Sequence, residues 1–295
     1  MKFDLSKDLI GIIAPASKIK NVEEKLEVVC KILAANGFKY IVADRIFEKE
    51  ALPFFAASYA NRVSGLKEML ENPEIKIVLP IMGGYGCTEI IFEFLNAKLE
   101  TPKTLIGFSD ITALHVLFNQ QFKVPTIHGA VYSPFFDIDS SSAIIDILKG
   151  EDIKFVLKPI NNSTSKGEIS GKMMGGNLTV FCNMIGTPLA PKTKGKILVF
   201  EDVNEKAYQV HRHLVHLKNA KLFDKVKAVI FGDFTKSDEH VEAALENFCK
   251  FHIPHIPTFK LENIGHGKVN TPFILGHKAS IIGNDFKQES PFSLK

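Results

Sequence analysis

The feature that most constrains the fold is a regular alternation, over the first half of the chain, between short apolar runs and longer segments with helical spacing. Helical spacing marks Val22–Asn36 and a region from Phe54 to Leu70, and further helices are predicted to begin near Thr88 and at Ser109. The apolar runs are typical of buried strands: Leu9–Ile13, Tyr40–Ala43, Ile75–Met82 and Leu105–Phe108. Strands that alternate with helices predict an α/β fold whose N-terminal half is a doubly wound, mostly parallel sheet.

The second half of the chain follows a polar stretch without periodicity at 161–167, which is typical of a domain boundary. A length of 295 residues is enough for two domains that each bury a core. Beyond this stretch the sequence predicts strands at Ile197–Phe200 and Val226–Phe231, with a helix at about Ala207–Leu217 between them. The remainder is rich in Gly and Pro with short strands. We therefore expect an N-terminal domain at 1–160 and a smaller, mixed α/β, barrel-like domain at 168–295.

Charge and cysteine usage narrow the class of protein. The formal net charge is only +3, whereas a nucleic-acid-binding protein is expected to carry a concentrated basic face. The four cysteines are far apart and form no C-x-x-C pair, which favours reduced thiols in the cytosol. The N-terminus lacks the pattern of a secretory signal, and no apolar run reaches the roughly 18 residues of a membrane span. We expect a cytoplasmic protein without nucleic-acid or membrane partners.

Ser109 is the first candidate for chemistry, because it lies in Gly107-Phe108-Ser109-Asp110, between a predicted strand and a predicted helix. A serine on such a turn can be the nucleophile of an elbow, with the next backbone N–H near its oxygen. The pattern is not G-x-S-x-G, because Ile111 occupies the place of the second glycine. Serine is also a preferred helix N-cap, and the local pattern alone favours that interpretation.

The run Gly83-Gly84-Tyr85-Gly86 follows another predicted strand at the same end of the sheet. Glycines let a backbone approach a ligand closely and direct amide N–H groups at an anion. The run has neither a G-x-G-x-x-G fingerprint nor a Lys-Ser/Thr ending. A phosphate loop, an oxyanion hole and a plain turn all remain open for it.

Two further candidates lie in the second half of the chain. Glu201 and Asp202 end the apolar run at 197–200, where a carboxylate can orient a histidine or bind a ligand cation. His266 lies between Gly265 and Gly267, and an accessible imidazole with a pKa near neutrality suits a general base. A solvated strand end and a surface histidine are equally open interpretations.

Two apparent metal patterns are discounted, and we expect no metal and no cofactor. The first consists of His211, His213 and His216, which lie in one predicted helix. Positions 211 and 213 point to different faces of that helix, so they cannot bind one metal ion together. The second consists of Cys249, His252 and His255, which are spaced three apart. Pro254 interrupts any helix there, and no second ligand pair has the spacing of a known zinc site. Cys87, at a predicted helix start, is a chemically reasonable rival nucleophile, although a buried thiol is the commoner role.

Taken together, the segments resemble the LD-carboxypeptidase family, the muramoyltetrapeptide carboxypeptidases. The resemblance covers almost the whole chain, and its motifs occur in the family's order. Those of the first half are Ile12-Ile13-Ala14-Pro15-Ala16-Ser17, Gly83-Gly84-Tyr85-Gly86, Gly107-Phe108-Ser109-Asp110-Ile111-Thr112-Ala113-Leu114 and Ile127-His128-Gly129. Those of the second half are Gly175-Gly176-Asn177-Leu178, Ile185-Gly186-Thr187-Pro188, Leu198-Val199-Phe200-Glu201-Asp202-Val203-Asn204-Glu205, Gly265-His266 and Leu275-Gly276.

The resemblance implies a serine peptidase with a Ser-Glu-His triad in a cleft between two domains. Ser109 would be the nucleophile, Glu201 the orienting carboxylate and His266 the base. The oxyanion hole would use the backbone N–H groups of Asp110 and Gly84. The resemblance favours the first acid of the Glu-Asp-x-x-Glu motif over the other two, and assigns no nucleophile to the position of the nearby cysteine.

The activity that the resemblance implies is cleavage of an L,D-peptide bond, which releases terminal D-alanine from murein tetrapeptide during cell-wall recycling, by a homodimer in the cytoplasm. Two alternatives stay open. One is a microcin-immunity type of hydrolase that cleaves acyl-adenylate toxins; those chains look longer and have an aromatic-lined nucleotide pocket, whereas this chain has no tryptophan. The other is a non-catalytic cleft-binding protein.

The chain departs from the family at two positions that bear on the substrate. Met82 stands where the family commonly has an arginine, immediately before the glycine run, and a second usual arginine is replaced around Glu89. An arginine there could clamp a substrate carboxylate with two parallel hydrogen bonds. The group that anchors the substrate carboxylate is therefore open.

Overall fold

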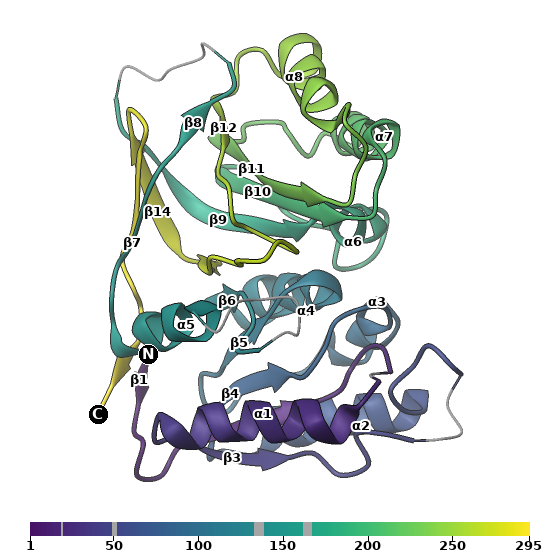
Figure 1. The fold of residues 1–295 in the computed structure, drawn as a ribbon, viewed down its shortest axis with the longest axis vertical. Helices are drawn as coiled ribbons and strands as arrows, with labels where there is room; N and C mark the ends of the chain where they lie inside the picture. The colour runs from purple at the N-terminus through teal and green to yellow at the C-terminus, as the bar shows by residue number, and fades with distance from the viewer. Residues whose placement is uncertain (19, 49–51, 133–138, 162–166) are drawn as a thin grey trace.

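Two sheets, one built mainly by each half of the chain, are stacked one above the other (Figure 1). The structure is a computed structural model, and it describes residues 1–295 except 19, 49–51, 133–138 and 162–166. Most of the polar stretch that was predicted to separate the domains, 162–166, thus lies outside the described residues. No helix in the described part of the chain is long and apolar enough to cross a membrane.

The first sheet has six strands in the order β13-β6-β5-β4-β2-β3. Neighbouring strands in it run parallel, except that β13 is antiparallel to β6. Its strands are β2 (Leu9–Ile13), β3 (Lys39–Val42), β4 (Ile75–Pro80), β5 (Thr104–Gly107), β6 (Thr126–His128) and β13 (Phe273–Leu275). The chain reverses its direction of winding between β2 and β4, so the loops after these strands flank a crevice at the sheet's carboxyl edge, where ligands of such folds bind.

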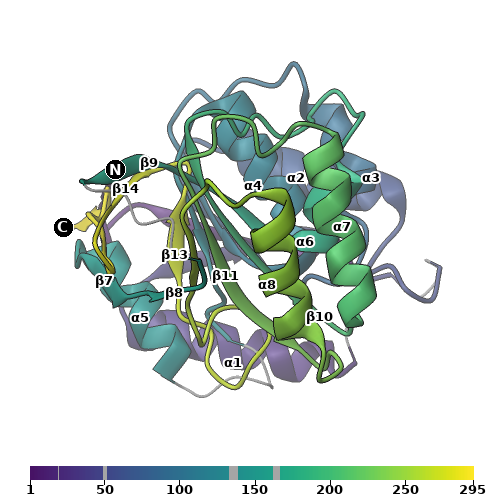
Figure 2. The same cartoon turned by 90° about the horizontal axis from the view of Figure 1, so that it is seen from above.

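Helices cover both faces of this sheet, with α1 and α5 on one side and α2, α3 and α4 on the other (Figure 2). The helices are α1 (Val22–Ala35), α2 (Tyr59–Glu71), α3 (Cys87–Ile90), α4 (Thr112–Leu117) and α5 (Asp139–Lys149). Short 3₁₀ turns η1 (Ile91–Phe94) and η2 (Ser109–Ile111) and a π turn η3 (Phe118–Phe122) extend them. The helix expected from Phe54 begins only at Tyr59, because the Ser58 side chain accepts a hydrogen bond from the Asn61 amide and caps it there.

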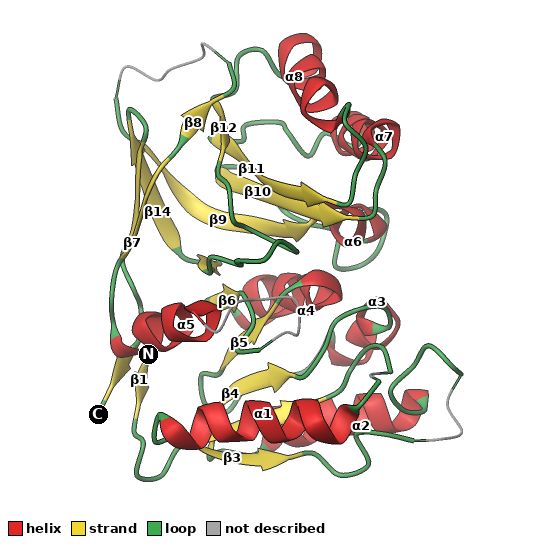
Figure 3. Ribbon diagram, viewed as in Figure 1, coloured by secondary structure: helices red, strands yellow, loops and turns green. Residues whose placement is uncertain are grey.

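The second sheet has eight strands in the order β7-β15-β14-β9-β10-β11-β12-β8. They are β7 (Ile153–Val156), β8 (Lys158–Pro159), β9 (Ile169–Asn177), β10 (Lys196–Val203), β11 (Ala228–Thr235), β12 (Thr258–Lys260), β14 (Lys278–Ile282) and β15 (Asp285–Gln288). The strands at its two ends, β7 and β8, are neighbours in the sequence, so the sheet curls into a nearly closed barrel (Figure 3). Strands β9 to β12 run parallel, and the other pairs are antiparallel.

Three helices pack outside the barrel: α6 (Leu178–Asn183), α7 (Ala207–Asn219) and α8 (Val241–His252). The expected fold class is confirmed: an α/β protein with a mostly parallel N-terminal sheet and a mixed, barrel-like C-terminal sheet.

The two sheets exchange strands across the predicted boundary. β13, from the C-terminal part of the chain, completes the first sheet, whereas β7 and β8, which precede residue 160, belong to the second. A third, two-stranded pairing joins β1 (Lys2–Phe3) to β16 (Ser293–Leu294), so both ends of the described chain lie together beside α5 (Figure 1). The division into domains at 1–160 and 168–295 stays a prediction.

Candidate active site

Ser109 lies on a sharp turn that connects β5 to η2. Its φ angle is +64°, in the left-handed region that residues with a Cβ seldom adopt. The residue that caps η2 is Phe108, and no side-chain hydrogen bond caps this turn. The expectation that Ser109 is an N-cap is therefore wrong, because the chain enters the turn through a strained conformation at Ser109 itself. A strained strand-to-helix turn of this kind is the geometry of a nucleophile elbow.

The glycine run after β4 packs directly against this turn. A Cβ placed on Gly83 would lie 2.9 Å from the Ser109 Cβ and 3.2 Å from the Asp110 nitrogen, so only glycine allows the approach. Two hydrogen bonds fix the run to Ser17: the Ser17 amide donates to the Gly83 carbonyl (3.2 Å), and the Tyr85 amide donates to the Ser17 hydroxyl (2.9 Å). The run is thereby held in place beside the serine.

The two amides expected to form an oxyanion hole flank the serine. Gly84 has a φ angle of +103°, and Asp110 follows Ser109 directly at the start of η2. Among the described residues, neither amide donates to another backbone group, so both are available to a ligand. The Asp110 carboxylate is turned away from this role, because it accepts a hydrogen bond from the Cys87 amide (2.8 Å).

Glu201 and His266 form a buried pair. The Nδ1 of His266 donates to the Oε2 of Glu201 over 2.7 Å. Glu201, near the end of β10, is completely buried, and His266 is 17% exposed at its side chain. Burial alone would raise the pKa of Glu201, but the His266 charge, the neighbouring His128 imidazole and the hydrogen bond from His266 lower it to about 2. Burial lowers and Glu201 raises the pKa of His266, and the net shift is upward.

The loop that carries His266 fits tightly over the carboxylate. Gly265 has a φ angle of +109°, and a Cβ on it would lie 2.4 Å from the Glu201 Oε2. The Gly265 amide donates to the Asn270 side chain (3.3 Å), which ties the loop back on itself. The Phe108 ring lies 4.9 Å, centroid to centroid, from the His266 imidazole. This contact brings the loop of the second half against the serine turn of the first.

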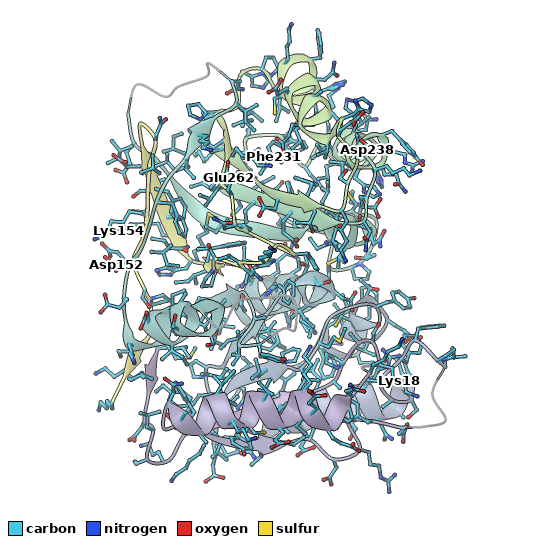
Figure 4. All side chains as sticks on the ribbon, viewed as in Figure 1. Lys18, Asp152, Lys154, Phe231, Asp238 and Glu262 are labelled. Carbon is cyan, nitrogen blue, oxygen red and sulfur yellow. The ribbon has the colours of Figure 1, made fainter. Side chains whose placement is uncertain are left out.

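One cavity of about 620 Å³ contains both Ser109 and His266 in its lining. It lies at the carboxyl ends of β4, β5 and β6 and reaches the start of α1. Among the described residues, its lining includes Gly83, Gly84 and Met82 near the serine and three lysines farther along: Lys18, Lys20 and Lys25. Lys18, labelled in Figure 4, comes from the loop between β2 and α1. Three of the expected site residues, Gly84, Ser109 and His266, thus line one cavity.

Cys87, the alternative nucleophile, and Asp202, the alternative carboxylate, are both held in other contacts. Cys87 is completely buried, and burial, followed by the nearby Asp110 carboxylate, raises the pKa of its thiol well above the usual value. A thiolate at the helix start is therefore disfavoured. Asp202 accepts hydrogen bonds from the Asn177 side chain (2.8 Å) and from the amide and hydroxyl of Thr179 (2.9 and 2.8 Å). Its role is to hold the turn between β9 and α6.

The discounted histidine patterns lie on the outer helices. His211 and His252 are ring neighbours across α7 and α8, with centroids 5.8 Å apart. Over the described ranges of the chain, no group of three or more histidine, cysteine or acidic side chains is placed to hold a metal ion.

Two features of the site were not foreseen. Glu89 forms an ion pair with the guanidinium of Arg62, whose Nη1 donates to both the Gly86 carbonyl (3.0 Å) and the Pro15 carbonyl (3.3 Å). The Arg62 side chain is fully buried, and its guanidinium carbon lies 4.0 Å from the centre of the Phe55 ring. Its contacts help to fix the position of the glycine run. The second feature is His128, whose Nε2 lies 3.7 Å from the Oε1 of Glu201. No spacing in the sequence connects these residues, which meet only in the folded chain.

The chain matches known proteins over most of its length. Residues 10–129 match the LD-carboxypeptidase N-terminal domain, and residues 170–281 match the LD-carboxypeptidase C-terminal domain. A putative carboxypeptidase of Rickettsia conorii is 37% identical, over 94% of this chain and 89% of the relative. The murein tetrapeptide carboxypeptidase of Pseudomonas aeruginosa is 28% identical, over 93% of each chain.

Solved structures share the fold. The crystal structure of muramoyltetrapeptide carboxypeptidase from Oxalobacter formigenes superposes with a TM-score of 0.78 at 23% identity, and covers 96% of this chain and 99% of that one. A structure of MccF in complex with glutamyl sulfamoyl guanosine gives a TM-score of 0.80 at 19% identity, over 98% and 97% of the two chains. Since both identities are low, these likenesses establish the fold alone.

Proposed function

This chain belongs to the LD-carboxypeptidase family, and from that premise we propose that it is a serine peptidase that releases terminal D-alanine from murein tetrapeptide. The observation that carries the proposal is the pairing of His266 with a buried Glu201, at a cavity that both His266 and Ser109 line. The name of the Pseudomonas aeruginosa relative suggests the substrate. Cell-wall recycling in the cytoplasm by a homodimer belongs to the same proposal.

The proposed reaction begins when the Nε2 of His266 takes the proton of the Ser109 hydroxyl as the oxygen attacks the peptide carbonyl. Glu201 stabilises the imidazolium that forms, because its carboxylate already accepts the Nδ1 proton. The imidazolium then gives its proton to the leaving nitrogen, and D-alanine departs. Water, activated in turn by His266, hydrolyses the acyl-enzyme and restores Ser109.

The amides of Gly84 and Asp110 are proposed to bind the oxyanion of each tetrahedral intermediate. Both flank the serine turn, and no other backbone group within the described residues occupies them. In other enzymes the loss of one such donor costs about 3–4 kcal/mol of transition-state stabilisation. The Ser17 contacts that fix the glycine run supply the rigidity that such a donor needs.

The substrate carboxylate needs a cation, and neither position where the family has arginine offers one. Met82 lines the cavity without charge, and Glu89 is paired with the buried Arg62. We propose that Lys25 takes this role, since it lines the same cavity and is partly buried there. Burial lowers the pKa of Lys25 to about 8, so most of the ammonium is still charged at neutral pH.

Mass spectrometry after incubation with murein tetrapeptide tests the proposed function. Release of D-alanine by the wild-type chain, but not by Ser109→Ala, is the expected result. Hydrolysis of an aminoacyl-sulfamoyl adenosine without turnover of tetrapeptide would instead favour the microcin-immunity type of reaction. Binding of tetrapeptide without turnover of either compound would favour a non-catalytic cleft protein.

A further inference from the structure

His128 is a completely buried histidine at the last position of β6, which lies next to the edge strand β13 of the first sheet. Its ring stacks on Phe273 of the neighbouring strand β13, with centroids 4.6 Å apart and an interplanar angle of 15°. The two residues face each other in the strand register. The sheet thus fixes the plane of the imidazole.

The ring faces the half of Glu201 that His266 does not reach. His266 binds the Oε2 of the carboxylate, whereas the Nε2 of His128 lies 3.7 Å from its Oε1. Within the described part of the chain, the Oε1 of Glu201 and both ring nitrogens of His128 have no hydrogen-bond partner. A carboxylate oxygen and an imidazole nitrogen, both buried and both without a partner, therefore lie opposite each other, short of full hydrogen-bond distance.

We propose that His128 is a positioning residue of the triad: its Nε2–H holds the Oε1 of Glu201 while the Oε2 is held by His266. A small shift of either side chain closes the remaining distance. The buried carboxylate then has a donor on each oxygen, which keeps it ionised and fixes its rotation toward His266. The role assigned to the pair rests on the proposed peptidase function, but the hydrogen bond itself does not.

The charge balance around the carboxylate explains why a second donor matters. A buried carboxylate with a single partner carries a large desolvation cost. The other acidic groups that act on this region, Asp202 on β10 and Asp233 on β11, add negative charge rather than relieve it. Lys236 acts electrostatically on His266. Of these groups, only His128 faces the Oε1 of Glu201.

His115, on α4 behind His128, does not supply the missing contact. Its Nε2–H donates to the Gly107 carbonyl and its Nδ1 accepts from the Thr126 hydroxyl, both at 2.8 Å. Burial lowers the pKa of His115 to about 3, so this ring is neutral. It lies 5.9 Å from the His128 ring and is a suitable control, because it is equally buried but directs these two hydrogen bonds to residues outside the triad.

The test is a titration of the His266 imidazole by NMR, which needs no substrate. When His266 loses its Nε2 proton, its positive charge no longer stabilises the Glu201 carboxylate, which then depends more strongly on the donor from His128. Without that donor the lone carboxylate is less stable, so the pair should hold its proton to higher pH. We expect His128→Phe, which keeps an aromatic ring on Phe273, to raise the apparent pKa of His266 by about one unit. His128→Gln, which keeps a donor, should stay near the wild-type value.

The His115→Gln control should change thermal stability without moving the His266 titration. If His128→Phe does not fold, His128→Met removes the donor with a more adaptable side chain and tests the same shift. The acid limb of kcat/KM should move to higher pH in parallel, with a lower kcat and an unchanged KM. An unshifted His266 titration in the donor-free variants would overturn the positioning role even if D-alanine release is confirmed. A wild-type chain that leaves tetrapeptide intact would overturn the peptidase function and leave the titration result standing.

Discussion

At the scale of single residues, Ser109 stores strain in its backbone. A φ angle of +64° costs a residue with a Cβ on the order of 1 kcal/mol or more, whereas glycine adopts it freely. We expect Ser109→Ala and Ser109→Gly both to lose activity by orders of magnitude, while Ser109→Gly is more stable than Ser109→Ala by about 1 kcal/mol. Chemical denaturation of the two variants measures the difference. Equal stabilities would mean that the turn is relaxed in solution.

Cys87 offers a contrasting test of the nucleophile. Because its thiol is fully buried and its pKa is raised, Cys87→Ala should keep most of the activity that Ser109→Ala loses. Turnover of both variants on the same tetrapeptide decides between them, with thiol alkylation of the wild-type chain as a control. A Cys87→Ala variant that is inactive beside an active Ser109→Ala would overturn the serine mechanism.

The pH dependence follows from the pair of Glu201 and His266. The base must be neutral to accept a proton, and the pKa of His266 is raised above its usual 6.5, so kcat/KM should rise with pH through a midpoint above that value. Glu201→Gln removes the charge that raises this pKa, so the limb should move to lower pH while kcat falls by roughly 10²–10⁴-fold. A flat profile between about pH 5 and 8, with chemistry rate-limiting, would contradict the role of His266.

Ser109, Glu201 and His266 could be proposed from the sequence because each lies in a short motif, and the motifs follow one another in a characteristic order. Their backbone conformations could not be predicted from the sequence. The local pattern at Ser109 favours a helix cap, and only the φ angle shows the strained turn. The approach of His128 to Glu201 was not predictable either, since it joins strands of different sheets that lie far apart along the chain.

At the scale of elements, the loop that follows β12 places the base through one glycine. A Cβ on Gly265 would collide with the Glu201 carboxylate, and its φ angle is unfavourable for other residues. Gly265→Ala should therefore lower kcat by at least tenfold and reduce stability by about 1–3 kcal/mol. Gly267→Ala is the matched control, since its Cβ would meet no atom nearer than 3.4 Å. If both variants behave alike, the loop does not position His266 in this way.

Helix α1 carries the proposed anchor of the substrate carboxylate. A charged hydrogen bond contributes about 1.5–3 kcal/mol, so Lys25→Met should raise KM by roughly 10- to 100-fold with little change in kcat. Lys25→Arg keeps the positive charge and should bring KM most of the way back to the wild-type value. Lys31→Met on the same helix, where the lysine is exposed and paired with Glu27, is the control. Tetrapeptide amidated at its C-terminus should no longer distinguish Lys25→Met from the wild type. An unchanged KM for the acid would exclude Lys25 as the anchor.

The elements themselves were predictable to different degrees. Apolar runs bounded by turns indicated β2, β4, β5 and β10 within a few residues. Strand β9 was missed because three glycines, at 171, 175 and 176, interrupt its apolar pattern. Helix α8 was missed although its buried positions follow helical spacing: Val241, Leu245, Phe248 and Cys249. Pro254 and Pro257, just beyond the helix, gave this part of the chain an irregular pattern.

At the scale of the whole molecule, the site is assembled from both sheets. Ser109 and His128 come from the first sheet, Glu201 from the second, and His266 from the loop between β12 and β13. The sequence predicted two α/β units but not that β13 returns to the first sheet after the second is built. Pairing of that strand depends on backbone hydrogen bonds between segments far apart in the chain, which leave no local pattern.

The late position of β13 and of His266 has a consequence for biosynthesis. A ribosome makes the serine turn first and the carboxylate next, while the base and the strand that stacks on His128 emerge last of the site's parts. Since the parts of a protein that are made first generally fold first, the nascent chain holds the proposed nucleophile without its proposed base. Under the proposed function, a chain built in this order stays inert on the ribosome, and its chemistry begins only once the returning strand has docked.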